Sequence, residues 1–475
     1  MPRSNRNPRL VPMIVACPLL LQNLDTSVMA TALPAMANSL QVQVLDLNLA
    51  ITSYLLSLAV FLPASAWLAE RFGAKRLFCT AILLFSLGSA LCGMAATLGQ
   101  LVVCRLLQGI GGSMMVPVGR SILLRSVPAD QMVKAMVWFT IPGAIGRLAG
   151  PVFGGAIVTV ASWRWIFLVN IPFGLLGAAL AWWFIDQDPE PAPHSAGSFD
   201  TVGLALLAVA LVGLLGGLEM IGKSMLPGPA IGVMVCVGLL SLYVYFRRSR
   251  AIEHPLLDFG VARFATFRTV LLGGFPMRVA IGAAPFLLPL LFQIGFGMTP
   301  MQSGLLTMAT ALGSLATRAA VTRAISIVGF RSLMIWSAVL AAVFYASYGL
   351  FTPDTPRGWM FFVMFLGGLC TSMAMVALNT VGYSDIPRER AGHATALAAM
   401  GQQISLAVGV VLGATVLAIT SHLHGRGPEH VGAADFPAAF VSIAALALCS
   451  AVAFRRLRPE DGAEMLGRSR PGPEV

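Results

Sequence analysis

Charged side chains are scarce in this chain. Asp, Glu, Lys and Arg together make up 11% of its 475 residues, whereas a soluble globular protein carries about 25%. So few charges cannot cover a water-facing surface of the required size, which excludes a soluble fold. With 57% hydrophobic residues and a mean hydropathy of +0.82, the composition indicates an integral membrane protein.

Recognisable catalytic, metal-binding and nucleotide-binding patterns are also missing. The seven cysteines lie in apolar runs without C-x-x-C spacing, so neither a disulfide framework nor a metal site is implied. There is no G-x-S-x-G, no H-E-x-x-H and no pair of acids inside the apolar runs, so the chain is not predicted to be an enzyme. Residues 217–224 match G-x-x-x-x-G-K-[ST], but an apolar helix precedes them instead of a strand. His422, His424 and His430 are interpreted as polar loop residues rather than metal ligands.

Long apolar runs, by contrast, are abundant. Fourteen of them are long enough to cross a bilayer as helices, which predicts an all-α integral membrane protein with fourteen spans. The runs lie near residues 10–36, 48–69, 77–95, 98–119, 135–160, 165–185, 201–220, 227–246, 269–294, 302–322, 332–351, 358–382, 394–420 and 436–454.

Lys and Arg are distributed unevenly between the two sides of these spans. If the N-terminus is cytoplasmic, 24 of the 31 fall in inner segments, four fall in outer loops and three lie inside spans. The positive-inside rule then places both termini in the cytoplasm. The net charge of +11 therefore reflects membrane orientation and does not indicate nucleic-acid binding.

Two unusual cytoplasmic loops divide the spans into groups of six, two and six. Residues 186–200 are acidic and rich in proline, and residues 247–268 are basic. Residues 329–333 echo residues 71–77, which suggests that the two groups of six are repeats. Two six-helix halves with a site near the bilayer midplane are the architecture of a secondary transporter. The predicted segments are an N-terminal bundle (1–186), a linker with two additional helices (187–268), a C-terminal bundle (269–454) and a cytoplasmic tail (455–475).

Asp25 is the one acid well inside a span. A charge at the bilayer centre costs at least about 2.5 kcal/mol and is usually kept for function. Burial favours the neutral carboxyl, so Asp25 is expected to bind and release a proton as its access to water changes. The alternative is that it pairs with an Arg or a helix end for folding alone.

Three arginines also lie inside spans. Arg105 and Gln108 share a helix face with two glycines, so they are expected to face the bundle interior, where Arg105 either tunes a nearby acid or forms a structural pair. Arg147 lies in a glycine stripe and needs a partner or a water-filled cavity. Arg278 is expected in the substrate cavity with Gln108, where it recognises an anionic or polar group or pairs with another helix.

Several of these segments resemble the major facilitator superfamily, and specifically its fourteen-span drug/proton antiporter branch. Residues 24–34 (L-D-T-S-V-M-A-T-A-L-P) resemble the branch's first-helix motif L-D-x-T-x-V-N-V-A-L-P. Residues 105–112 resemble the fourth-helix motif R-x-x-Q-G-x-G, which the family associates with proton transfer. Residues 163–172 and 254–258 also resemble stretches of the branch.

Two further motifs resemble motifs of the same family, one associated with gating and one with antiport. Residues 66–76 (A-W-L-A-E-R-F-G-A-K-R) resemble the loop motif G-x-L-A-D-R-x-G-R-K, which implies a cytoplasmic gating role for Glu70, Arg71, Gly73, Lys75 and Arg76. Residues 146–155 fit the fifth-helix antiporter motif G-x-x-x-G-P-x-x-G-G at every fixed position. This motif comprises Gly146, Arg147, Gly150, Pro151, Gly154 and Gly155.

The resemblance implies a multidrug exporter of the cytoplasmic (inner) membrane. It would move small amphipathic compounds in exchange for protons by alternating access, with the proton gradient as its energy source and no cofactor. Substrates of neutral or anionic charge deserve the same weight as cations, because one buried acid is accompanied by three buried arginines. A periplasmic adaptor and an outer-membrane channel are compatible further partners. The alternatives are a metabolite importer on the same fold and a membrane sensor or scaffold that transports nothing.

Overall fold

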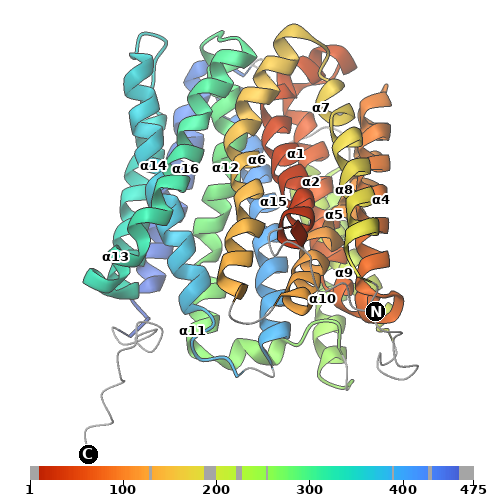
Figure 1. The fold of residues 1–475 in the computed structure, drawn as a ribbon. Helices are drawn as coiled ribbons and strands as arrows, with labels where there is room; N and C mark the ends of the chain where they lie inside the picture. The colour runs from red at the N-terminus through yellow and green to blue at the C-terminus, as the bar shows by residue number, and fades with distance from the viewer. Residues whose placement is uncertain are drawn as a thin grey trace, which may run out of the picture. The chain divides into compact units, whose positions relative to one another are not determined.

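The computed structural model describes residues 10–127, 131–186, 199–220, 227–252, 255–387, 390–425 and 431–458 (Figure 1). Every regular element within these ranges is a helix, so the all-α prediction is confirmed. By contacts between their Cα atoms the chain divides into two compact units. One comprises the chain up to Leu256 together with Thr299–Gly304, and the other comprises Leu257–Met298 and the chain from Leu305 onward.

The first unit contains ten α-helices. They are α1 (Leu10–Leu40), α2 (Asn48–Phe61), α3 (Ala64–Phe72), α4 (Ala74–Met94), α5 (Leu98–Ser126), α6 (Met132–Val160), α7 (Trp165–Leu168), α8 (Asn170–Phe184), α9 (Thr201–Met220) and α10 (Gly228–Ser249), with the short 3₁₀-helix η1 (Val44–Leu47) between α1 and α2. Among them, α1 packs along α6, and α5 packs against both α2 and α4. Helix α5 therefore occupies the middle of the helices that carry the polar residues described below.

The two additional helices, α9 and α10, pack chiefly on each other, and α9 also contacts α2. Gly213 and Gly238 face one another across this pair, and a Cβ atom at Gly213 would lie 2.6 Å from the carbonyl oxygen of Met234. An ion pair between Arg248 and Asp200 (3.1 Å) joins the cytoplasmic ends predicted for these two helices.

The second unit contains the remaining helices of the described ranges, except that the first residues of α13, up to Gly304, belong to the first unit. They are η3 (Phe259–Arg263), α11 (Ala265–Arg268), the π-helical turn η4 (Thr269–Gly273), α12 (Phe275–Leu290), the π-helical turn η5 (Leu291–Gly295), α13 (Pro300–Tyr348), α14 (Arg357–Val381), α15 (Ala391–Leu423), η7 (Ala433–Asp435) and α16 (Phe436–Phe454). Helix α12 packs against α15 and α16, and it is buried on nearly all sides. It forms the core of this unit.

Thirteen helices within the described ranges are long and apolar enough to cross a membrane. The difference from the predicted fourteen arises in α13, whose 49 residues would extend about 73 Å, more than twice the thickness of the hydrocarbon core. Gly329 interrupts this helix with φ 77° and ψ 166°. The break separates the two spans predicted at 302–322 and 332–351, so α13 supplies two passes.

The loops after the second span of each group of six share one backbone feature. Gly73 (φ 85°, ψ 135°) joins α3 to α4, and Gly329 occupies nearly the same region of conformational space within α13. Only glycine adopts this region at low cost. The similar turns support the internal repeat inferred from residues 71–77 and 329–333. The boundaries of the four predicted segments stay predictions. Parts of two of these segments, 187–268 and 455–475, lie outside the described residues.

Candidate functional site

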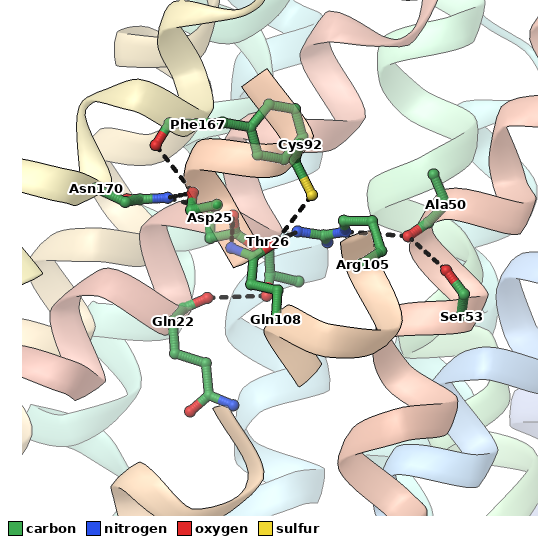
Figure 2. A network of polar contacts seen from close by, with 11 residues as sticks. Gln22, Asp25, Thr26, Ala50, Ser53, Cys92, Arg105, Gln108, Phe167 and Asn170 are labelled. Atoms are coloured by element: carbon green, nitrogen blue, oxygen red, sulfur yellow. Dashed lines mark hydrogen bonds and ion pairs between the residues drawn. The ribbon is translucent and has the colours of Figure 1, made fainter. Parts of the chain in front are cut away.

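Asp25 lies on α1 inside the first unit, and its side chain is almost completely buried. One carboxylate oxygen, Oδ2, is 2.6 Å from Nη1 of Arg105. The other, Oδ1, accepts hydrogen bonds from the amides of Gln108 (2.9 Å) and Asn170 (3.4 Å). Figure 2 shows the carboxylate between these three side chains, so both of its oxygens are satisfied within the protein.

Arg105 and Gln108 reach Asp25 together because they are three positions apart on α5, which places them on the same face of the helix. Nη1 of Arg105 also donates to Oε1 of Gln108 (2.8 Å), and Nε donates to the backbone carbonyl of Ala50 on α2 (3.1 Å). The guanidinium lies 4.3 Å from the ring centre of Tyr54. Arg105 therefore has three hydrogen-bond partners and an aromatic ring beside it, and only one of these four is the carboxylate.

A second set of hydrogen bonds holds the partners of Asp25 in place. The amide of Asn170, at the start of α8, also donates to the hydroxyl of Ser89 on α4 (3.0 Å), which donates to the carbonyl of Phe167 (2.9 Å). The thiol of Cys92 donates to Oε1 of Gln108 (3.7 Å). The network, drawn in Figure 2, thus links six helices of the first unit around one carboxylate: α1, α2, α4, α5, α7 and α8.

Close helix packing makes this arrangement possible. A Cβ atom at Gly88 on α4 would lie 2.7 Å from the Cα of Gln108, and one at Gly109 would lie 2.9 Å from the carbonyl oxygen of Tyr54. Gly109, one of the glycines predicted on α5 to permit helix approach, therefore does so toward α2, and Gly88 lets α4 approach α5 at Gln108. A larger residue at either position would push α4 or α2 away from the polar side chains.

Arg105 does not depend on Asp25 alone for its hydrogen bonds. Besides the carboxylate, its guanidinium donates to the amide oxygen of Gln108 and to the backbone carbonyl of Ala50. Removing one member of a buried ion pair is costly, because the remaining charge loses its compensation.

The residues of the predicted gating motif lie apart from this network, around the junction of α3 and α4. Glu70, Arg71 and Arg76 are exposed, and within the described part of the chain neither Glu70 nor Arg71 forms an ion pair. Lys75 is mostly buried, with its ammonium group 5.3 Å from the ring centre of Trp182 on α8. The gating role of this loop stays a prediction.

The glycines of the predicted antiporter motif line the surface of α6 that packs on α1. A Cβ atom at Gly146 would lie 2.7 Å from the carbonyl oxygen of Leu20, one at Gly150 would collide with Ser27, and one at Gly154 would lie 2.9 Å from Val28. The contact points on α1 fall on both sides of Asp25. Pro151 and Gly155 continue the same helix, and the side chain of Arg147 is exposed rather than confined within the stripe.

Arg278 belongs to the second unit, on α12, and is 2% exposed. Its Nη1 donates to the carbonyl of Val270 (3.3 Å), and its Nε has no partner. The sequence predicted that Arg278 and Gln108 share a substrate cavity. In the structure they belong to different units, so the shared cavity stays a prediction.

Asn170 and Ser89 were not among the residues singled out from the sequence. Asn170 could have been found, because it is an amide inside the apolar stretch 163–172. Ser89 carries no such signal, since a single hydroxyl in an apolar helix is common and its role depends on the packing of α4 against α8.

The three histidines predicted to be polar loop residues lie only partly within the described residues. Nδ1 of His424, at the end of α15, lies 2.6 Å from the carboxylate of the buried Asp435, while His430 lies outside the described residues. Residues 221–224 of the phosphate-loop match lie outside them as well. Across the residues that the structure describes, no three His, Cys, Asp or Glu side chains gather where they could hold a metal ion.

Comparison with known proteins adds a family, relatives and a fold. The family model described as Major Facilitator Superfamily matches residues 16–410 and 270–470. A protein of Pectobacterium atrosepticum named "Putative multidrug resistance protein MdtD" is 36% identical over 450 residues, covering 94% of this chain and 95% of its own. Its namesake from Klebsiella pneumoniae is 37% identical, with 96% of both chains covered. The crystal structure of a D-xylose-proton symporter matches 95% of this chain and 98% of its own with a TM-score of 0.67 and 15% identity.

Proposed function

Because this chain belongs to the Major Facilitator Superfamily, as its motifs suggested, we propose that it exports small amphipathic compounds across the cytoplasmic membrane in exchange for protons. Membership of the family and its many membrane-spanning helices make it a multi-pass membrane transporter of the multidrug efflux type rather than an enzyme. Exchange with protons, the direction of transport and the charge of the substrate are the parts that we propose.

The observation that carries the proposal is the buried pair of Asp25 and Arg105 at 2.6 Å. A coupling site must exist in two protonation states of similar free energy. Gln108, Asn170 and the carbonyl of Ala50 supply alternative partners for both groups when the proton arrives. A carboxylate with a purely structural role would not need a guanidinium that stays satisfied without it.

In the proposed cycle, Asp25 accepts a proton when the transporter is open to the outside and loses it when it is open to the cytoplasm. Proton loss restores the charged pair with Arg105, and proton binding neutralises Asp25 and loosens α1 from α5. Helix α1 also packs along α6 through the stripe of Gly146, Gly150 and Gly154. A change at Asp25 is therefore transmitted to the helix whose sequence resembles the antiporter motif.

The proposed direction of transport rests on two observations. The curated relatives are named as multidrug resistance proteins, and residues 146–155 match the motif that exporters show more often than importers. The proposed orientation follows from the excess of Lys and Arg on one side, 24 against four, which places both termini in the cytoplasm.

The direction can be tested in bacterial cells that lack their own major efflux pumps. Cells are loaded with ethidium or with a neutral or carboxylate dye and then energised with glucose, and dye loss is followed by fluorescence. We expect faster loss of at least one dye with the wild-type protein, and loss at the background rate with Asp25→Asn. The matched control is Asp354→Asn, an exposed acid between α13 and α14, which should behave as wild type.

Accumulation of the dyes on energisation, instead of their loss, would favour a metabolite importer. Unchanged efflux in the Asp25→Asn variant, at equal amounts of protein in the membrane, would remove Asp25 from the coupling mechanism.

A further inference from the structure

Arg278 is a buried cation with few hydrogen-bond partners. It lies in the first turn of α12, directly after the π-helical turn η4, and its side chain is 2% exposed. A guanidinium carries five N–H donors and cannot give up its charge in a protein. Its guanidinium donates a hydrogen bond to the carbonyl of Val270 at 3.3 Å, and that oxygen already accepts from the amide of Gly274 at 3.1 Å.

The charge of Arg278 has no counterpart within the described part of the second unit. The titratable side chain that interacts with it electrostatically is Tyr383, a phenol rather than a carboxylate. Asp385, in the same turn as Tyr383, accepts a hydrogen bond from the hydroxyl of Thr266 instead. The neighbouring hydroxyl of Ser450 is used by the backbone N–H of Met277.

The buried Arg105 shows by contrast how a guanidinium is compensated in the same protein. It is equally buried, yet it has a carboxylate at 2.6 Å, an amide oxygen at 2.8 Å and a carbonyl at 3.1 Å. Arg278 has one long bond to a carbonyl and an Nε without a partner. A buried cation without compensation costs several kcal/mol, so a chain that keeps one has a place for an anion from outside.

The surroundings of Arg278 also indicate the shape of that anion. Tyr383, the phenol that interacts with Arg278, has its ring 6.3 Å, centre to centre, from the ring of Phe267. A guanidinium binds a planar carboxylate through two parallel hydrogen bonds, and aromatic rings accept a flat apolar body. This combination suits an amphipathic aromatic acid better than an inorganic ion.

We propose that Arg278, with Phe267 and Tyr383, binds the carboxylate end of amphipathic organic anions that this protein transports. The assignment rests on the proposed transport function for its biological meaning, but binding itself requires no proton gradient. It makes organic acids, rather than lipophilic cations, the substrate class of the site in the second unit.

The test is equilibrium binding to the purified full-length protein in an uncharged maltoside detergent, where no anionic lipid headgroup competes. The probes are 1-naphthoate, its neutral amide 1-naphthamide and the cation 1-naphthylmethylammonium, and binding is read from ligand-induced thermal stabilisation and from isothermal titration. In the wild type we expect naphthoate to bind about tenfold or more tightly than the amide. The cation should bind more weakly than the amide or not at all.

Three variants complete the test. Arg278→Met should reduce naphthoate affinity about 10- to 100-fold and leave the weak amide binding unchanged. Arg278→Lys, which keeps the charge but loses the planar fork, should fall between the two. Arg323→Met removes an exposed arginine of the same unit and should bind as wild type.

Equal binding of acid and amide by the wild type would overturn the proposal even if Arg278→Met does not fold. Naphthoate affinity unchanged in a folded Arg278→Met variant would overturn it too. Adding Asp25→Asn separates this proposal from proton coupling, because that variant should lose driven efflux and still bind naphthoate. If acids bind through Arg278 but no compound is exported, the transport proposal fails and the binding site stands.

Discussion

At the scale of single residues, Asp25 and Arg105 depend on one another. The side chain of each is 1% exposed, and each neutralises the other at 2.6 Å. Removing one partner of a buried pair costs more than removing both, because a lone charge is left behind.

This dependence predicts a non-additive pair of substitutions. Arg105→Met should lower the free energy of unfolding by about 3 kcal/mol, because Asp25 must then stay charged without its partner or take up a proton. Adding Asp25→Asn should recover part of that loss, since the new amide oxygen can still accept from Gln108 and no charge remains. Thermal unfolding of the four proteins of this double-mutant cycle in detergent provides the measurement. Additive effects would show that the two side chains do not act as a pair.

The sequence was informative about these residues to different degrees. Asp25, Arg105 and Gln108 were identifiable because ionisable and amide groups are rare inside apolar spans, and helical spacing put the last two on one face. That Asp25 meets them could not be known from composition or spacing, because the contact joins α1 to α5 across 80 positions of the chain. Asn170 and Ser89 required the packing of α8 against α4.

At the scale of helices, close approach between α1 and α6 positions the helix that carries Asp25. The regular spacing of Gly146, Gly150 and Gly154 predicted a packing stripe, and the structure places all three against α1. The helix boundary between the tenth and eleventh spans was also predicted, although hydrogen bonding runs nearly continuously through α13 and the break depends on Gly329.

Substitution of Gly146 measures the importance of this packing. A Cβ atom there would lie 2.7 Å from the carbonyl oxygen of Leu20, and backbone atoms of α1 cannot move aside independently. Gly146→Ala should therefore destabilise the protein by about 1–3 kcal/mol and slow transport. Gly232→Ala on α10 is the control, because no atom lies within 4 Å of its Cβ position and alanine favours a helix by up to about 1 kcal/mol. Equal thermal stability of the two variants would argue against a packing role for the stripe.

At the scale of the whole molecule, the sequence determined the class and the number of spans with little ambiguity. A charged fraction of 11% and fourteen apolar runs leave few alternatives to a multi-span helical transporter. Function was harder to derive, because the same fold serves unrelated substrates and its specificity depends on a few side chains. In the site that we propose, Arg278 distinguishes acids from cations. Its lack of a counter-charge among the described residues of the second unit becomes apparent only after folding.

Orientation is a testable property at this scale. Because 24 Lys and Arg fall on one side of the spans and four on the other, both termini are expected in the cytoplasm. Green fluorescent protein fused after Val475 should fluoresce, since it folds in the cytoplasm, and alkaline phosphatase at the same point should be inactive. Alkaline phosphatase fused after Asp354, in a predicted outer loop, should be active. The reverse pattern of activities would invert the proposed cycle.

The central claim is that Asp25 couples solute export to proton entry, and proton movement itself is its most direct readout. Everted membrane vesicles are energised by respiration so that their interior becomes acidic, and the pH gradient is followed with a quenched acridine dye. Cationic, neutral and carboxylate compounds are then added one at a time. We predict that at least one compound partly collapses the gradient in wild-type vesicles and in Asp354→Asn vesicles, but not in Asp25→Asn vesicles. Collapse of the gradient to the same extent in the Asp25→Asn vesicles would contradict the account.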